Sequence, residues 1–126
     1  MIILKELFYA KSHEWVKFTD GNEALVGLSD FAQRALGDLV FVNLPNTGDS
    51  VLSGEAFGDV ESVKGVSDIF SPVDGDVSEI NTALLDSPQL INEDPYGSWL
   101  IKVGDVTGRA DLMDSEAYEK YCEEVE

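Results

Sequence analysis

The sequence has few basic residues, a single cysteine and a single histidine. Among its 126 residues, 8 are Lys or Arg and 25 are Asp or Glu, which gives a formal net charge of −17. A surface this acidic repels phosphate backbones and anionic lipid, so we expect neither nucleic acid nor a membrane as a partner. With one cysteine, Cys122, the chain forms no internal disulfide, which indicates a reducing compartment.

The lone histidine and the short apolar runs exclude further classes of protein. His13 by itself rules out a metal site built from several histidines and leaves a Ser–His–acid triad one place to start. No apolar run approaches the length of a membrane span, and the start of the chain at Met1–Glu6 is too short and too soon charged for a signal peptide. We therefore expect a soluble, intracellular protein without a metal.

Apolar residues are nevertheless plentiful enough to build a core. Hydrophobic residues make up 44% of the chain and aromatic residues 10%, and the length suits one compact domain over residues 1–126. Glycines and prolines separate many short apolar runs, a pattern typical of a mainly β protein. Strands are expected at residues 13–18, 24–28, 39–43, 56–63, 66–70, 75–81 and 99–103.

Helical signals are fewer. Ser29 is a good N-cap for a short helix over residues 30–36, which Gly37 would end. A helical turn is expected at residues 84–90, interrupted by Pro88. From residue 114, apolar residues recur every three or four positions and predict an amphipathic C-terminal helix, at Tyr118, Tyr121, Cys122 and Val125.

A short pattern occurs twice in the chain. In residues 41–51, and again in residues 70–77, a strand leads through a proline turn to Gly-Asp and an apolar residue. Two copies of one strand-turn unit are compatible with a quasi-symmetric sandwich, although Pro and Gly-Asp are common in turns.

One of the few lysines, Lys64, lies between two of the expected strands. The run Val63-Lys64-Gly65-Val66 places it at the tip of a hairpin, followed by the glycine that a tight turn favours. A solvated turn lysine is the commoner interpretation of such a residue. The alternative is a presentation site, where a modifying enzyme acylates the amine and the side chain becomes the base of a mobile arm.

Four blocks of sequence together carry a resemblance to a known family. They are Ser12-His13-Glu14-Trp15-Val16, Gly37-Asp38-Leu39-Val40-Phe41-Val42, Glu61-Ser62-Val63-Lys64-Gly65-Val66-Ser67-Asp68, and Asn92-Glu93-Asp94-Pro95-Tyr96-Gly97 with Trp99. In this order, from about Tyr9 to the C-terminus, they resemble the H protein of the glycine cleavage system. The resemblance implies a flattened antiparallel barrel or sandwich of the lipoyl/biotinyl-carrier type, with a short internal helix and a C-terminal helix. It also implies that Lys64 carries lipoate in amide linkage.

The resemblance further implies a non-catalytic carrier of glycine catabolism. A pyridoxal-phosphate-dependent glycine decarboxylase (P protein) would load the lipoyl disulfide with a methylamine unit, and a tetrahydrofolate-dependent aminomethyltransferase (T protein) would take the one-carbon unit. Dihydrolipoyl dehydrogenase (L protein), with FAD and NAD, would reoxidise the dithiol, and a lipoylating enzyme would attach the arm. Apart from lipoate, these cofactors belong to the partners. We expect a monomer in the bacterial cytoplasm, or in the mitochondrial matrix for a processed eukaryotic chain.

The same resemblance assigns residues to the site. Those flanking Lys64 are Glu61, Ser62, Val63, Gly65, Ser67 and Asp68. The family more often has Ala at the position of Gly65, which would loosen the tip without removing chemistry. The free end of a loaded arm is expected to be a cationic amine that needs a counter-charge and shelter from water. By resemblance, Ser12, Glu14 and Asp68 hold it, with His13 packed nearby.

Other functions stay open at this point. A lipoyl or biotinyl carrier domain of another multienzyme complex would share the hairpin lysine. An unmodified acidic interaction domain would leave Lys64 without an acyl group. A small glycosidase needs paired carboxylates, and no pair stands out among the acids. The net charge has two interpretations. It keeps a small carrier soluble, or it steers the carrier towards basic surfaces on its partners.

Overall fold

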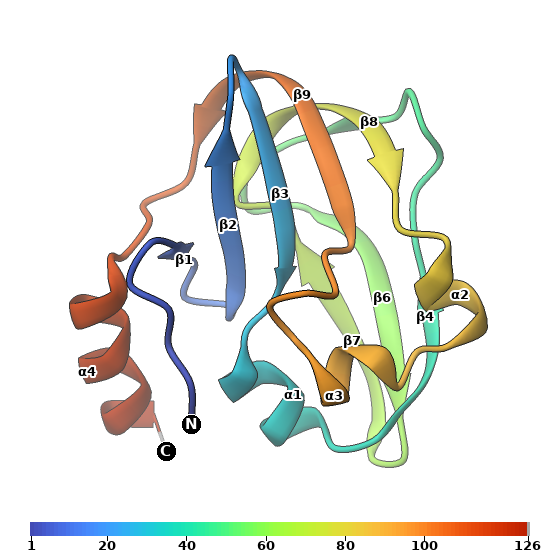
Figure 1. The fold of residues 1–126 in the computed structure, drawn as a ribbon, viewed down its shortest axis with the longest axis vertical. Coiled ribbons are helices and arrows are strands. Elements are labelled where there is room, and N and C mark those ends of the chain that lie inside the picture. The colour runs from blue at the N-terminus through green and yellow to red at the C-terminus, as the bar shows by residue number, and fades with distance from the viewer. Residues whose placement is uncertain (126) are drawn as a thin grey trace.

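The computed structural model describes residues 1–125 as a succession of short strands with helices between and after them (Figure 1). In chain order the elements are β1 (Phe8–Tyr9), β2 (Glu14–Thr19), β3 (Glu23–Leu28), α1 (Asp30–Leu36), β4 (Leu39–Asn43), β5 (Ser50–Val51), β6 (Ala56–Ser62), β7 (Gly65–Phe70), β8 (Val73–Ile80), α2 (Ala83–Asp86), α3 (Leu90–Glu93), β9 (Ile101–Arg109) and α4 (Ser115–Val125). A six-stranded sheet has the order β1-β2-β3-β9-β8-β5, and a three-stranded sheet has the order β4-β6-β7. The predicted mainly β sandwich with an internal and a C-terminal helix is confirmed.

The main core lies between the two sheets. Because side chains alternate along a strand, Val26 and Val103 of the six-stranded sheet and Val60 and Ile69 of the three-stranded sheet all turn inward and are buried in one cluster. A second cluster lies where α4 packs against the outer part of the six-stranded sheet; its buried members are Leu7, Tyr9, Trp15, Tyr118 and Cys122. Trp15 therefore belongs to the core, and Trp99 packs on the same cluster while partly buried.

Helix α1 begins and ends where the sequence predicts. The Ser29 hydroxyl accepts a hydrogen bond from the backbone N–H of Ala32 at 3.2 Å. Gly37 has φ 81°, a left-handed conformation that favours glycine, and its N–H donates to the Gln33 carbonyl at 3.0 Å. Within residues 1–125, no helix is long and apolar enough to cross a membrane.

Strands β8 and β9 extend beyond their predicted limits. A turn was expected through residues 71–75, yet β8 begins at Val73, and β9 continues to Arg109. The glycines explain the difference. A Cβ on Gly75 would lie 2.6 Å from Val103 Cγ1, and one on Gly108 would lie 2.4 Å from Asp74 Oδ2. These glycines therefore permit close strand pairing rather than marking turns.

The repeated pattern has a structural counterpart. In the first copy the chain leaves β4 of the three-stranded sheet, turns at Pro45 and enters β5 of the six-stranded sheet. In the second copy it leaves β7, turns at Pro72 and enters β8 in the same way. Strands β5 and β8 then pair antiparallel, with Val51 opposite Gly75. Both copies thus cross between the sheets at their proline turns and meet side by side.

Candidate functional site: the hairpin lysine and the adjoining cavity

Lys64 lies at the tip of the β6–β7 hairpin, which Figure 1 shows at the bottom of the molecule. Ser62 and Gly65 form the last cross-strand pair, so Val63 and Lys64 make a two-residue turn. The Lys64 N–H donates to the Ser62 hydroxyl at 3.1 Å, and that hydroxyl donates to the Gly65 carbonyl at 3.4 Å. The tip thus has a defined conformation.

Gly65 does more than loosen this tip. Its φ is 149°, in the region that L side chains rarely adopt, although a Cβ there would meet no atom within 4 Å. The preference for glycine at this position therefore comes from the backbone conformation and not from crowding.

The Lys64 side chain is exposed and turns back towards α1. Its Nζ donates to the Ala35 carbonyl at 3.2 Å. That carbonyl belongs to the last turn of the helix, where carbonyls lack partners within the helix and attract cations. The unmodified amine is thus accessible and is held at the end of α1.

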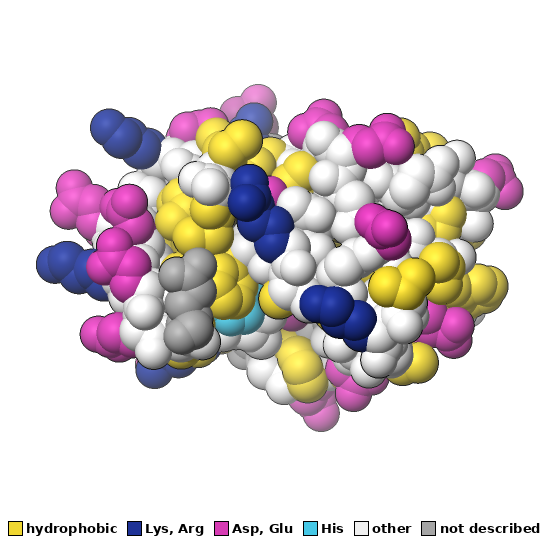
Figure 2. Space-filling view, turned by 90° about the horizontal axis from the view of Figure 1, so that it is seen from below, with side chains coloured by type: hydrophobic (Ala, Val, Ile, Leu, Met, Phe, Trp, Pro, Cys, Tyr) yellow, Lys and Arg dark blue, Asp and Glu magenta, His cyan; other side chains and the backbone are white. Residues whose placement is uncertain are grey.

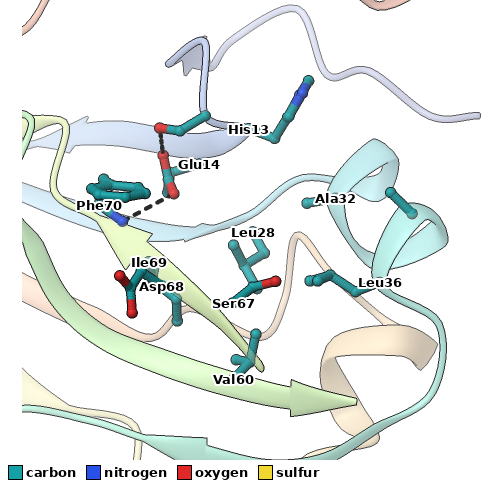
Figure 3. Close-up of a pocket in the computed structure, with 12 residues that line it drawn as sticks. His13, Glu14, Leu28, Ala32, Leu36, Val60, Ser67, Asp68, Ile69 and Phe70 are labelled. Atoms are coloured by element: carbon teal, nitrogen blue, oxygen red, sulfur yellow. Dashed lines mark hydrogen bonds between the residues drawn. The ribbon is translucent and has the colours of Figure 1, made fainter. Parts of the chain in front are cut away.

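A cavity of about 410 Å³ extends from this region between α1 and β7 (Figure 3). Its lining residues are Ser12, His13, Glu14, Leu28, Ala32, Ala35, Leu36, Val60, Ser67, Asp68, Ile69 and Phe70. A smaller cavity of about 190 Å³ beside Lys64 shares Ala35, Leu36 and Ser67 with it. The hairpin tip borders the smaller cavity, Ser12–Glu14 border the larger one, and the two cavities adjoin.

Glu14 is a buried carboxyl in the wall of the larger cavity, with only 1% of its surface exposed. The Ser12 hydroxyl donates to Oε1, and the Phe70 N–H donates to Oε2 at 3.1 Å (Figure 3). Burial raises the pKa of Glu14 to about 7, and these hydrogen bonds to the charged form oppose that rise. Neither ion pair found within residues 1–125 involves Glu14. The carboxyl is thus held by neutral donors and suits a cation that enters the cavity.

Asp68 borders the cavity but lies apart from this pair. Ser67 pairs across the sheet with Val60, and Asp68 pairs with Asp59. Side chains alternate along β7, so Asp68 projects to the opposite side from Ser67 and is exposed, yet it still borders the cavity. All three residues assigned to a loaded arm thus line the cavity, with Ser12 and Glu14 hydrogen-bonded to each other and Asp68 apart from them.

His13 is a packed and hydrogen-bonded residue, as expected. Its Nδ1 lies 2.8 Å from the Tyr118 hydroxyl, and its ring stacks on Phe31 with centroids 4.3 Å apart. Burial lowers the pKa of the imidazole. Its ring is therefore tied to α4 and α1.

Sequence reasoning missed the α1 wall of the cavity and the Phe70 N–H. A signal for the wall was present in the sequence, because Ala32, Ala35 and Leu36 recur at helical spacing within residues 30–36. Small alanine side chains on that face leave room that larger residues would fill. The role of Phe70 resides in its backbone, which carries no residue-specific signal.

The loop at residues 92–97 has a structural role. The Asn92 amide accepts from the Leu39 N–H and donates to the Gly37 carbonyl, both at 2.9 Å. It thereby fixes the connection from α1 to β4, next to the hairpin that bears Lys64.

The surface around Lys64 combines charge and apolar side chains. Val63 and Val66, next to Lys64 in the hairpin, are 71% and 65% exposed. Seen from this end of the molecule, acidic side chains stand around the rim, with hydrophobic and basic side chains between them (Figure 2).

Comparison with known proteins gives consistent matches over nearly the whole chain. The family model described as "Glycine cleavage H-protein" matches residues 7–125. The glycine cleavage system H protein of Lachnoclostridium phytofermentans is 54% identical over 121 residues, covering 96% of this chain and 95% of that protein. The mitochondrial glycine cleavage system H protein 2 of Arabidopsis thaliana is 54% identical over 126 residues, covering 98% of this chain and 80% of that protein. The crystal structure of a glycine cleavage system H protein from Mycobacterium marinum superposes with a TM-score of 0.87 at 39% identity, covering 98% of both chains.

Proposed function

Because the chain belongs to the glycine cleavage H-protein family, we propose that Lys64 is the residue that carries its covalently attached lipoate. Members of this family are the non-catalytic lipoyl carriers of the glycine cleavage system, and they work with the other enzymes of that system. The family assignment favours this carrier over a carrier domain of another complex, an unmodified interaction domain or a glycosidase.

The observation that carries the proposal is the placement of Lys64. Its exposed amine lies on a conformationally defined tip. The two adjoining cavities extend from the residues beside Lys64 to the buried Glu14 carboxyl. A volume of about 410 Å³ falls in the usual range of small-molecule sites. The apolar stretch along α1, with Ser12 and Glu14 beyond it, fits a hydrocarbon arm that ends in a polar group.

Bound lipoate would supply the disulfide that is reduced, loaded with the methylamine group of glycine and later reoxidised. The protein supplies attachment, shelter and a counter-charge. Acylation removes the positive charge of Lys64, so the arm can lie along Ala35 and Leu36 without burying an ammonium. The amide retains one N–H, which can still donate to the Ala35 carbonyl and orient the base of the arm.

We assign the holding of the loaded end to Ser12 and Glu14. A cationic amine entering the cavity would meet a Glu14 carboxylate already oriented by the Ser12 hydroxyl and the Phe70 N–H. Such a charge-assisted hydrogen bond is stronger than a neutral one. Asp68, which also borders the cavity but is exposed, is a further candidate contact for the arm, and with Glu61 and Ser62 it flanks the modification site.

The partners follow from the chemistry. We propose that a glycine decarboxylase loads the arm, a folate-dependent aminomethyltransferase unloads it, and dihydrolipoyl dehydrogenase reoxidises it. Each encounter must be brief, which suits a monomer that docks through charged contacts. The curated relatives include both bacterial chains and a mitochondrial one.

Peptide-resolved mass spectrometry of the protein from its native cells tests the attachment site. We expect a lipoyl adduct on the peptide that contains Lys64, and none in a Lys64→Ala variant. The other lysines, such as Lys102, serve as internal controls in the same digest. An unmodified or biotinylated Lys64, in cells that make lipoate, would refute the proposal.

A further inference from the structure

Helix α4 contributes one buried hydroxyl that contacts two segments bordering the larger cavity. Tyr118 is fully buried and stacks on Tyr9, with ring centroids 4.2 Å apart and planes 2° from parallel. Its hydroxyl lies 2.8 Å from His13 Nδ1 and 2.7 Å from Ser29 Oγ. The stack holds the ring, and the contacts with His13 and Ser29 join the hydroxyl to two other segments of the chain.

The two contacts reach different segments that border the cavity. His13 lies between Ser12 and Glu14, the residues that we assign to the loaded end. Ser29 is the N-cap of α1, the helix that forms one wall of the cavity. Tyr118 does not line the cavity itself, so it acts on the cavity only through these two residues.

The segment that bears Ser12 and Glu14 needs such support. His13 has φ 76°, an unfavourable conformation for a residue with a side chain, which persists only where the surroundings impose it. The Tyr121 hydroxyl, also from α4, donates to the Lys11 carbonyl at 3.0 Å. Helix α4 thus fastens this segment at two points, close on either side of Ser12.

We propose that Tyr118 is a positioning residue for the carried group, which sets the place of the Ser12–Glu14 segment relative to α1. The inference rests on the proposed function of the cavity and extends it to the C-terminal helix. Without the hydroxyl, the strained segment relaxes and the cavity opens to water around the Glu14 carboxyl. The loaded arm would then lose part of its shelter although every lining residue is still present.

The test compares Tyr118→Phe with Tyr9→Phe. The two substitutions each remove one buried hydroxyl from the same aromatic stack. The Tyr9 hydroxyl, however, bonds to the backbone of Leu4, away from the cavity. Tyr121→Phe is a third variant, with a surface hydroxyl whose loss leaves the core intact, and it carries the test if Tyr118→Phe does not fold.

The first readout is the pKa of Glu14, measured in protein without lipoate by a pH titration of its carboxyl ¹³C NMR signal. We expect Tyr118→Phe to move the pKa of Glu14 from about 7 towards its usual value, because water enters. The second readout is the decay of protein loaded with the methylamine group by glycine and glycine decarboxylase. We expect decay to be about fivefold faster in Tyr118→Phe. Tyr9→Phe should match the wild type in both readouts.

An unchanged Glu14 titration with unchanged decay in folded Tyr118→Phe would overturn the positioning role. Equal changes in Tyr118→Phe and Tyr9→Phe would also overturn it, since they would reflect the aromatic stack alone. The proposed holding role of Glu14 is judged separately by Glu14→Gln. If the loaded form of Glu14→Gln decays at the wild-type rate, Glu14 does not hold the loaded amine. The effect of Tyr118→Phe on the pKa of Glu14 then decides by itself whether Tyr118 positions the segment.

Discussion

At the scale of single residues, Glu14 determines what the cavity can hold. Its carboxyl is almost fully buried and accepts hydrogen bonds from Ser12 and Phe70, yet no cation is paired with it within residues 1–125. A buried carboxyl in this state is unfavourable when ionised and becomes favourable once a cation arrives. The site therefore favours a charged amine over a neutral group of the same size.

Replacing Glu14 by Gln tests this preference directly. The amide keeps the size of the side chain and removes the counter-charge, so the loaded amine is held less firmly. We expect the loaded form of Glu14→Gln to decay about tenfold faster than wild type at pH 8. Release of formaldehyde or ammonia over time measures the decay. Glu79→Gln, which changes an exposed carboxyl that does not line the cavity, is the matched control, and equal effects of both variants would contradict the assignment.

The stability of the protein should also depend on Glu14 and pH. Its pKa is raised from 4.5 to about 7 in the fold, so between these values the folded protein keeps a proton that the unfolded chain has released. The contribution of Glu14 is thus fully present at low pH and falls as pH rises to about 7, by about 3 kcal/mol. Urea unfolding at pH 5 and pH 8 measures this change. Glu14→Gln lacks the titrating group, so parallel pH profiles for the two proteins would refute the prediction.

At the scale of secondary-structure elements, the glycines have different structural roles in turns and in strands. Gly37 ends α1 and Gly65 shapes the hairpin tip, both through a positive φ. Gly75 lies inside β8, where a Cβ would lie 2.6 Å from Val103 Cγ1 and 2.7 Å from the Gly104 carbonyl. Gly104, facing β8, has its nearest such contact at 3.7 Å, with Ser78 Cβ.

Alanine substitutions in these strands should therefore give opposite results. Gly75→Ala forces β8 away from β9 and is expected to lower the free energy of unfolding by about 2 kcal/mol. Gly104→Ala has room for its methyl group and should stay within about 0.5 kcal/mol of wild type. Chemical denaturation of the two variants gives the comparison. A Gly75→Ala protein as stable as Gly104→Ala would show that the strands tolerate separation.

These glycines also explain how far sequence analysis reached. The limits of α1 could be predicted because Ser29 and Gly37 act on the nearest turn of the chain. The limits of β8 and β9 could not, since Gly75 signals a turn unless its neighbour in β9 is known. In the site, the resemblance pointed to Ser12 and Glu14. The contact between His13 and Tyr118 joins residues 105 positions apart, and no local pattern reveals such a pair.

At the scale of the whole molecule, the excess of acids suits brief encounters with several partners. Acidic side chains surround the end of the molecule that bears Lys64, with exposed Val63 and Val66 beside it (Figure 2). A net charge of −17 can attract a basic rim at long range, while the small apolar area limits how long the partners stay together.

A higher salt concentration should therefore lower the rate at which the carrier reacts with its partner enzymes. Raising the ionic strength from about 0.05 to 0.3 M shortens the screening length about 2.5-fold, and we expect the reoxidation rate constant with dihydrolipoyl dehydrogenase to fall about tenfold. Stopped-flow absorbance of the flavin measures the reaction. Free dihydrolipoamide, which carries no protein charge, is the control substrate and should be nearly unaffected. Equal salt profiles for both substrates would rule out steering by the carrier's charge.

The sheet crossings have a consequence for stoichiometry. The first copy of the repeated pattern runs from β4 into β5, and the second from the end of β7 into β8, so the β6–β7 turn lies in the segment between the two copies. Anything within a duplicated unit is present twice, but the link between two units exists only once. Lys64, the proposed attachment site, lies in that segment, and neither copy of the pattern contains a lysine. If the proposal holds, one molecule therefore carries a single lipoyl arm and one loaded group.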